Sequence, residues 1–382
     1  MTHEEYMKTA LELAGKAVGF TSPNPMVGAV IVKNGAIIGK GYHKKCGGLH
    51  AEREAFVYCD GLGIDCSGAD MYVTLEPCCH YGKTPPCTEA IINHGIKRVF
   101  IGSSDPNPLV SGNGTKILRE HGIEVTEGIL KNECDALNEI FFHYITTGMP
   151  FVTMKYAMTM DGKIACYTGE SKWITGEQAR MNVQQERLRH SAIMVGIGTV
   201  LADNPTLTCR LENGRNPVRI ICDTHLRIPD DCNIVRTSGE IPTIIASCSE
   251  NTEKMLLLEN MGCTVLNIPE KDGHINLNIL AEKIGSMKID SILLEGGGEL
   301  NWSMLNAGLV NKVQAYIAPK IFGGSGAKSP VSGMGVSVPS DAFMLTDMKI
   351  SRIGEDILME SNVKYRKQGE KCSQESSRKS EL

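Results

Sequence analysis

Strand-like and helix-like stretches alternate along almost the whole chain, and this alternation limits the possible folds more than any other feature of the sequence. Such a pattern predicts layered α/β structure, in which helices cover largely buried sheets. The segment Gly148-Met149-Pro150 interrupts the alternation, and glycine and proline together mark a break between elements. We therefore expect two α/β domains, over residues 1–147 and 150–366.

The first predicted domain begins with a helix, because residues 3–18 carry apolar side chains at helical spacing. Asn34-Gly35 separates two short apolar runs, 27–32 and 36–39, and is a strong signal for a two-residue hairpin. The remaining expected strands are 71–75, 98–102 and 124–126, and the expected helices are 51–59, 88–94, 117–121 and 131–146.

The second predicted domain continues the alternation. Its expected strands are 151–157, 193–196, 218–222, 243–246, 291–294 and 312–317, with helices at 176–189, 253–261 and 277–286. Residues 367–382 are mostly Lys, Glu, Ser and Gln and offer little to bury, which predicts a disordered tail.

Charge and cysteine usage narrow the function. The net charge is −5 and the sequence has no basic stripe. Both features argue against nucleic-acid binding as the main function. The chain contains no run of 18 apolar residues, so no membrane span is expected, and the acidic N-terminus does not resemble a signal peptide. The 14 cysteines are irregularly spaced, which favours reduced thiols and one metal site over a disulfide framework. We expect a cytoplasmic protein.

The most informative residues are His50-Ala51-Glu52, followed by Pro77-Cys78 and then Cys87. One His and two Cys can hold Zn²⁺ with a fourth position open, where a bound water becomes acidic enough to act as a nucleophile near neutral pH. A carboxylate beside the metal can then carry protons, so we assign Glu52 as the catalytic base of a hydrolytic deaminase.

The alternative is a closed, structural zinc site that only holds the loop in place. Such a site needs a fourth protein ligand. Cys79 or His80 could supply that ligand. The known deaminase signature has two residues between its cysteines, whereas Cys78 and Cys87 lie nine positions apart. Glu52, two residues from His50, favours the open, catalytic site.

The stretch from Leu75 to Cys87, Leu-Glu-Pro-Cys-Cys-His-Tyr-Gly-Lys-Thr-Pro-Pro-Cys, closely resembles the bifunctional deaminase–reductases of riboflavin biosynthesis. That family usually has Ser where this chain has Cys79, and the departure leaves the ligand set intact. Segments 22–28 and 105–108 resemble the family as well. The resemblance implies a cytidine-deaminase-like three-layer α/β/α domain whose substrate pocket is lined by Asn24, His80, Lys83, Asp105 and Asn107. Taken alone, these residues would more often be turn residues or solvated charges.

The C-terminal half has no intact G-x-G-x-x-G dinucleotide fingerprint. Gly196-Ile197-Gly198 and Gly296-Gly297-Gly298 match its start, but Leu201 and Asn301 stand where its last glycine belongs. Residues 292–300 nevertheless read as strand, glycines and helix, an arrangement that serves as an anion site about as often as it is a plain tight connection. Residues 155–163, 171–175, 195–205 and 294–297 resemble the reductase half of the same family. That half implies a dihydrofolate-reductase-like α/β fold.

Carried over by position, the resemblance assigns residues to the cofactor and to the sugar phosphate. NADPH would be held by Ala157, Trp173, Thr199, Asp203, Thr224, Gly297, Gly298, Glu299, Leu300, Asn301, Trp302 and Ser303. The substrate would be held by Ser171, Leu207, Arg210 and Glu295, and we assign Lys155 and Glu295 to polarising the sugar.

The implied reactions are hydrolysis of the 2-amino group of a diaminopyrimidinone ribosylamine 5′-phosphate, followed by reduction of the ribosyl chain to ribityl. Two other interpretations stay open: a nucleic-acid-editing deaminase, since tRNA adenosine deaminases share His-x-Glu and Pro-Cys, and a structural zinc protein with a non-catalytic nucleotide-binding half. Residue types alone do not separate NADPH from NADH. Assembly into dimers or tetramers is an expectation from the family.

Overall fold

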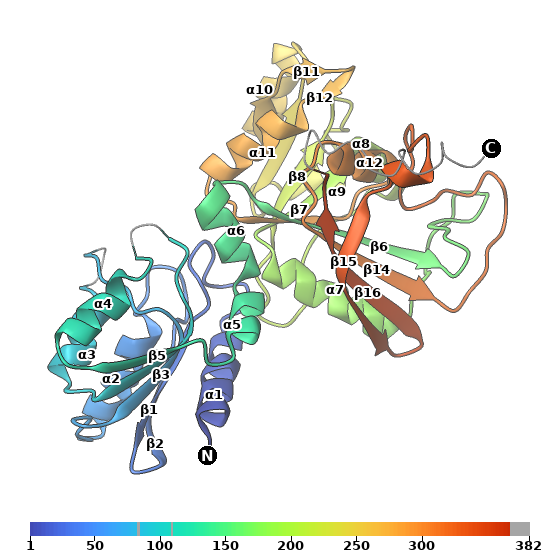
Figure 1. Ribbon diagram of the computed structural model, residues 1–382. Coiled ribbons are helices and arrows are strands. Elements are labelled where there is room, and N and C mark those ends of the chain that lie inside the picture. Colours follow the sequence, from blue (N-terminus) through green and yellow to red (C-terminus); the bar gives the residue numbers. More distant parts are fainter. Residues whose placement is uncertain (82–84, 108–109, 367–382) are drawn as a thin grey trace, which may run out of the picture. The chain divides into compact units, whose positions relative to one another are not determined.

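The computed structural model describes residues 1–81, 85–107 and 110–366, which form two compact units (Figure 1). The first unit joins Met1–Phe151 to Met181–Leu293, and the second joins Val152–Arg180 to the chain from Leu294 onward. The units follow compactness and not chain order, so the domain boundary near residues 148–150 stays a prediction. The tail expected at 367–382 lies outside the described residues.

A five-stranded sheet organises residues 1–147. Its strand order is β2-β1-β3-β4-β5, and the strands are β1 (Gly28–Lys33), β2 (Ala36–Tyr42), β3 (Asp70–Leu75), β4 (Arg98–Ser103) and β5 (Glu124–Glu127). Strand β1 pairs antiparallel with β2 and β3, whereas β3, β4 and β5 run parallel to one another. The predicted hairpin at Asn34-Gly35 is confirmed: both residues have positive φ, 53° and 79°, as a tight two-residue turn requires.

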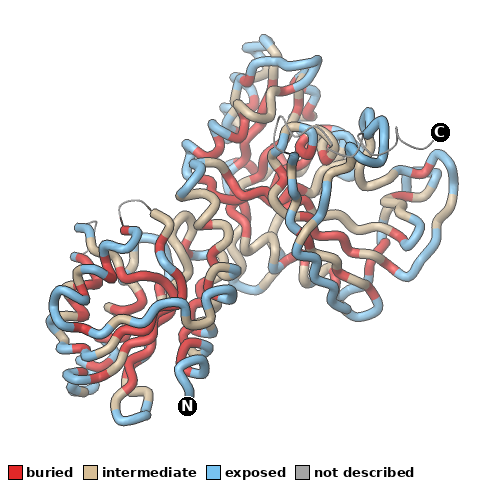
Figure 2. The backbone as a smooth tube through the Cα atoms, in the orientation of Figure 1, coloured by how far each residue is buried: buried red, intermediate tan, exposed pale blue. Residues whose placement is uncertain are grey.

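Helices cover both faces of this sheet (Figure 1). They are α1 (His3–Gly15), α2 (Ala51–Gly61), α3 (Cys87–Asn93), α4 (Asn113–Glu120) and α5 (Lys131–Leu137), and α6 (Glu139–Thr147) follows α5 in the chain. Successive residues of β1 separate the two cores: Ile31 packs in the cluster with α2, α3 and α4, while Val30 packs in the cluster with α1 and α5. Both faces of the strands are therefore buried (Figure 2), which confirms the predicted three layers.

The single helix predicted over 131–146 is wrong. Two helices, α5 and α6, meet at Asn138, whose φ of −107° and ψ of 19° lie outside helical values. The buried Asn138 side chain instead accepts a hydrogen bond from Met26 N at 2.8 Å and donates one to Met26 O at 3.0 Å. The asparagine side chain can form hydrogen bonds with backbone groups that compete with the helical backbone bonds. The spacing of apolar residues, on which the prediction rested, carries no information about such hydrogen bonds.

The rest of the first unit contains a largely parallel set of strands in the order β10-β9-β8-β7-β13. These are β7 (Ala192–Gly196), β8 (Val218–Cys222), β9 (Thr243–Ser247), β10 (Thr264–Asn267) and β13 (Ser291–Leu294). The helices are α7 (Glu177–Arg189), α8 (Ile197–Asp203), α9 (Asn233–Arg236), α10 (Thr252–Asn260) and α11 (Leu277–Ser286), and β11 (Glu270–Lys271) pairs with β12 (His274–Ile275). The strands and helices predicted here are confirmed, whereas α8, α9, β10 and the small β11–β12 hairpin were not predicted.

The second unit has strands in the order β6-β14-β16-β15. They are β6 (Phe151–Thr159), β14 (Lys312–Ala318), β15 (Met344–Ile353) and β16 (Asp356–Lys364), with α12 (Gly298–Asn306) and the short 3₁₀ helix η1 (Pro339–Asp341). The β15–β16 hairpin was not predicted; most of β15 is exposed, and its register with β16 shifts between Thr346 and Lys349. Within the described residues, no helix combines the length and apolarity needed to span a membrane.

Candidate active site and metal centre

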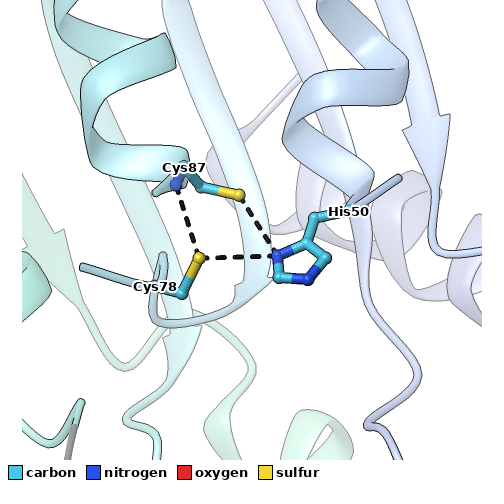
Figure 3. A group of neighbouring side chains, drawn as sticks. All are labelled: His50, Cys78 and Cys87. Atoms are coloured by element: carbon cyan, nitrogen blue, oxygen red, sulfur yellow. Dashed lines mark hydrogen bonds between the residues drawn. The ribbon is translucent and has the colours of Figure 1, made fainter. Parts of the chain in front are cut away.

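Three chain segments bring the predicted metal ligands together. His50 caps the start of α2, Cys87 is the first residue of α3, and Cys78 lies in the loop that follows β3. Figure 3 shows the two sulfur atoms and the imidazole turned toward one point. Cys78 and Cys87 come from the connection between the carboxyl end of β3 and the start of α3, whereas His50 comes from the loop between β2 and α2.

The donor spacing suits a tetrahedral ion. His50 Nδ1 lies 3.5 Å from Cys78 Sγ and 3.4 Å from Cys87 Sγ, and all three donor atoms lie within 4.8 Å of one another. With Zn–S bonds of about 2.3 Å and Zn–N bonds of about 2.0 Å, a tetrahedral angle places nitrogen and sulfur about 3.5 Å apart. Among the described residues, no other group of three or more His, Cys, Asp or Glu side chains has this spacing.

The environment of the thiols favours a deprotonated sulfur. A hydrogen bond from the Cys87 side chain, aided by one from His50 and opposed by burial, lowers the pKa of Cys78 to about 4. Backbone N–H of Cys87 also donates to Cys78 Sγ at 3.3 Å. Conversely, the hydrogen bond to Cys78 and burial raise the pKa of Cys87 well above its usual value. The pair thus shares a proton that a cation bound between them would displace.

Glu52 lies in the first turn of α2, two residues beyond His50, and its side chain is only 3% exposed. Burial raises the pKa of Glu52, with a smaller contribution from Cys78. A carboxyl group whose pKa is raised holds a proton more readily than an ordinary one, which suits a group that takes up and releases a proton during a reaction. The geometry therefore places a candidate acid–base group beside the ligands, as the sequence predicted.

Cys79 does not belong to the ligand group. It is half-buried, burial raises the pKa of its thiol, and the ligand cluster contains Cys78 and Cys87 without it. His80 is exposed and is also absent from that cluster. Among the described residues, neither joins the ligand cluster, so a zinc ion held by His50, Cys78 and Cys87 would keep one position for water or substrate.

Asn24 is held beside the ligands by a residue that sequence reasoning missed. Asn24 Nδ2 donates to Nε2 of His43 at 3.2 Å, and His43 Nδ1 donates to the carbonyl of Leu49 at 2.8 Å. The His43 ring also packs edge-on against His50, 5.6 Å between centroids. His43 is 3% exposed and burial lowers its pKa, so it stays neutral and keeps an acceptor for Asn24. His43 follows β2 without a motif, which is why the sequence gave no signal for it.

Asp105 and Asn107 lie on the loop after β4, next to the loop that carries Cys78. Asn107 N donates to Asp105 Oδ1 at 2.8 Å, an Asx turn that fixes the carboxyl group. Burial raises the pKa of Asp105 to about 6, and the charge of the exposed His80 opposes this rise. The structure thus brings His80 near Asp105, with Asn107 on the same loop as Asp105, whereas Lys83 lies outside the described residues.

Glu76 connects the two loops and was also missed. Its buried carboxylate accepts hydrogen bonds from the backbone N–H groups of Asp105 at 3.4 Å, Gly112 at 3.1 Å and Thr115 at 3.3 Å. Two of these donors lie at the start of α4, where a negative charge is favourable. The motif Glu76-Pro77-Cys78 therefore combines a loop anchor with a ligand, and only the ligand was recognised.

In the second unit, the two residues assigned to polarising the sugar, Lys155 and Glu295, lie close together. Lys155 on β6 lies 3.7 Å from the Glu295 carboxylate, and both side chains are 14% exposed. Lys155 Nζ also lies 5.7 Å above the ring centroid of Tyr316. Ala157, two residues along β6, is the register partner of Tyr316 on β14. The middle of this strand pair thus places a charged pair beside an aromatic ring.

Two further predicted residues of this unit, Ser171 and Trp173, lie in the loop before α7. Ser171 is half-buried, whereas Trp173 is 58% exposed, and the Arg180 guanidinium lies 4.7 Å from the Trp173 ring centroid. An exposed indole stacked by a cation offers a flat surface to a ligand ring, and its exposure argues against a purely structural core role.

The glycine-rich turn predicted at 296–298 leads directly into α12, with Gly297 as the N-cap. A Cβ atom on Gly298 would lie 2.6 Å from Ser332 Oγ, while one on Gly297 would meet nothing within 4 Å. Glu299 accepts from Ser332 Oγ at 2.9 Å, and Ser303 Oγ donates to the carbonyl of Glu299 at 2.9 Å. The remaining predicted residues of this segment are Leu300, the half-buried Trp302 and the buried Asn301, which donates to Pro330 O.

The other predicted cofactor and substrate residues belong to the first unit. Thr199 and Asp203 lie on α8, and Thr224 follows β8, where its carbonyl accepts from Cys248 N at 3.0 Å. Leu207 is buried with a φ of 54°. Arg210 is exposed, and its backbone N–H donates to the buried Gln184 at 2.9 Å. Their roles toward cofactor and substrate stay predictions.

Comparisons with known proteins agree with this arrangement. The model of the cytidine and deoxycytidylate deaminase zinc-binding region matches residues 1–103, and that of the RibD C-terminal domain matches residues 150–359. The riboflavin biosynthesis protein RibD of Actinobacillus pleuropneumoniae is 55% identical over 360 residues, covering 94% of this chain and 95% of that protein. RibD of Escherichia coli is 39% identical, covering 94% of this chain and 99% of that protein.

Solved structures give the same result. A deaminase/reductase of Thermotoga maritima, named for diaminohydroxyphosphoribosylaminopyrimidine and 5-amino-6-(5-phosphoribosylamino)uracil, has a TM-score of 0.82 at 41% identity, covering 94% of this chain and 98% of its own. RibD of Acinetobacter baumannii has a TM-score of 0.82 at 34% identity, covering 95% and 99%.

Proposed function

This chain belongs to the RibD family and is a bifunctional deaminase and reductase of riboflavin biosynthesis, and we propose that Glu52 is the proton carrier of its deaminase half. Its N-terminal domain is cytidine-deaminase-like, and its C-terminal domain is dihydrofolate-reductase-like. The single observation that carries the proposal is the buried Glu52 beside a three-donor site whose spacing fits a tetrahedral zinc ion.

The deamination removes the 2-amino group of 2,5-diamino-6-ribosylamino-4(3H)-pyrimidinone 5′-phosphate. When bound by His50, Cys78 and Cys87, Zn²⁺ supplies a water of lowered pKa. Glu52 would take one proton from the attacking water as the water oxygen bonds to C2 of the ring, and would pass it to the ring nitrogen. The proton of the resulting C2 hydroxyl would then move through Glu52 to the amino group, which leaves as ammonia while the C2 carbonyl forms.

We assign recognition of the pyrimidine and its phosphate to the residues around this site. The Asn24 amide, oriented by His43, can exchange hydrogen bonds with the polar ring edge. Asp105 accepts hydrogen bonds from ring or amino N–H groups, while Asn107 and the exposed His80 flank it. Lys83, outside the described residues, is assigned to the phosphate.

The reductase half uses NADPH to convert the ribosyl side chain into ribityl, which gives 5-amino-6-ribitylaminouracil 5′-phosphate. Bound NADPH supplies the hydride that adds to C1′. We propose that the Lys155–Glu295 pair polarises the opened sugar. Arg210 is exposed and suits a phosphate, and Trp173 and the start of α12 suit the cofactor.

The small, phosphorylated pyrimidines of this pathway are the partners that the two domains fit. A nucleic-acid-editing activity is not favoured, because both family models and the full-length relatives point to the riboflavin enzymes. We further propose a cytoplasmic homodimer or homotetramer that does not bind nucleic acid. Light scattering on the purified protein tests the assembly, and a tRNA binding titration at physiological salt tests the partner.

The test of the proposed function is a sequential assay on the full chain. Purified protein given the diaminopyrimidinone substrate without NADPH should release ammonia and stop. Addition of NADPH should then produce NADPH oxidation in proportion to the ammonia released. Oxidation without prior ammonia release would reverse the proposed order, and release of no ammonia by zinc-loaded protein would refute the substrate assignment.

A further inference from the structure

The loop that carries Asn24 is held by residues from a distant part of the chain within the same compact unit. Ser22 Oγ donates to Asp290 Oδ2 at 2.6 Å and lies 2.6 Å from Ser191 Oγ. Ser191 Oγ donates to Asp290 Oδ1, also at 2.6 Å. We call Ser22, Ser191, Ser291 and Asp290 the serine–aspartate clamp.

Three of the four clamp residues are buried, and Ser22 is half-buried. Asp290 is 3% exposed, Ser191 7% and Ser291 0%. Ser291 Oγ donates to Asp290 Oδ1 at 2.8 Å and accepts from Ser191 N at 2.9 Å. Hydroxyl groups surround both carboxylate oxygens, which fixes their direction, since hydrogen bonds to a charged acceptor are stronger than those between neutral groups.

The loop needs an external anchor for a local reason. Pro23 and Pro25 have no backbone N–H, so the segment around Asn24 has few hydrogen bonds of its own. One internal bond, from Asn24 N to Thr21 O at 2.8 Å, closes a single turn. The Asn24 side chain is held by His43, and the Ser22 side chain anchors the loop itself two residues before Asn24.

A second contact fixes the start of the loop from the same side. Arg215 Nε donates to the carbonyl of Gly19 at 2.8 Å. Gly19 has a φ of 83°, and a Cβ atom there would lie 2.4 Å from the carbonyl oxygen of Leu188. Only glycine permits this close approach. The end of the loop is fixed independently, where Asn138 binds both backbone groups of Met26.

We propose that Asp290, with Ser191, positions Asn24 for deamination, so that the deaminase reaction depends on residues that follow the reductase boundary in the sequence. Asp290 and Ser22 are positioning residues, because they act through Asn24 and touch no reacting atom. The inference rests on the proposed role of Asn24 in binding the pyrimidine. It gives a physical reason for the two activities to share one chain.

The test measures steady-state ammonia release by the full chain. Ser22→Ala should raise KM for the diaminopyrimidinone about tenfold and change kcat by less than about twofold, as expected when ground-state and transition-state binding are lost equally. Asp290→Asn should act in the same direction. Tyr144→Phe is the matched control, because it removes another hydrogen bond between the same chain regions, Tyr144 OH to Gly285 O at 2.9 Å, and should keep the wild-type KM.

A double-mutant cycle separates positioning from a general structural effect. In an Asn24→Ala background, Ser22→Ala should raise KM no further. An undiminished effect in that background, or an unchanged KM in both Ser22→Ala and Asp290→Asn, would overturn the inference. Failure of the proposed function is distinguishable, because the wild-type protein would then release no ammonia.

Discussion

His50 Nδ1 lies 3.4 Å from Cys87 Sγ, although the two residues are 37 positions apart in the chain. The contact joins the start of α2 to the start of α3, with β3 between them in sequence. Helix N-termini favour thiolates and anions, so the fold itself prepares these positions to bind a cation through deprotonated ligands.

Removal of one thiol should abolish metal binding. Cys87→Ala is expected to lose zinc and ammonia release, while NADPH oxidation with the deaminated pyrimidine is retained. Zinc content by atomic absorption, together with both activities, checks this. Cys79→Ser is the matched control, because Cys79 lies outside the ligand cluster and its loss should leave about one zinc per chain. A zinc-free Cys79→Ser protein would contradict the ligand assignment.

The acid limb of the deaminase pH profile should reflect Asp105. Because burial raises the pKa of Asp105 to about 6, the side chain is a carboxylate above that pH and becomes protonated as the pH falls through it. If the carboxylate accepts hydrogen bonds from substrate, kcat/KM for ammonia release should fall below pH of about 6. Asp105→Asn should have lower kcat/KM and lack this step. A limb that is unchanged in Asp105→Asn would assign the titration to another group.

The Glu76 anchor should stabilise the protein. Glu76→Gln keeps the size of the side chain but weakens its bonds to three backbone N–H groups, and we expect the free energy of unfolding to fall by about 1–3 kcal/mol. Urea unfolding followed by circular dichroism measures it. Glu120→Gln, at the exposed end of α4 in a 3.9 Å ion pair with Lys116, should change stability by less than about 0.5 kcal/mol. Equal losses of unfolding free energy in Glu76→Gln and Glu120→Gln would contradict the role of Glu76 as an anchor.

The Lys155–Glu295 pair should matter only to reduction. Lys155→Ala and Glu295→Ala are each expected to lower kcat for NADPH oxidation at least about tenfold, which corresponds to ~1.4 kcal/mol of transition-state stabilisation. Ammonia release should be unchanged, since it is proposed to occur at a separate site. Stopped-flow absorbance of NADPH makes the measurement, and full turnover in both variants would end this assignment.

Sequence reasoning reached the layers of the fold and the metal ligands because both leave local patterns. Alternating strands and helices, the Asn34-Gly35 hairpin and the spacing of His50, Cys78 and Cys87 can be read without long-range information. The break at Asn138 could not be read, because its cause is a side-chain bond to Met26, 112 residues away in the chain.

The supporting residues were missed for the same reason. His43 and Glu76 act through hydrogen bonds to Asn24, Leu49, Asp105, Gly112 and Thr115, and no sequence motif marks such bonds. The β15–β16 hairpin was overlooked because most of β15 is exposed, so it has no buried apolar run of the kind that identifies the central strands. Ligands and cores leave patterns in sequence, whereas anchors depend on which segments the fold brings together.

The most direct test of the central assignment is ammonia release by Glu52→Gln, with zinc counted in the same preparation. Glu52 is buried beside the ligands and binds no metal itself, so the variant should keep about one zinc per chain while release falls by about 10²–10⁴-fold. That result would establish Glu52 as the proton carrier of a zinc-dependent deaminase. Release at the wild-type rate from zinc-loaded Glu52→Gln would contradict it.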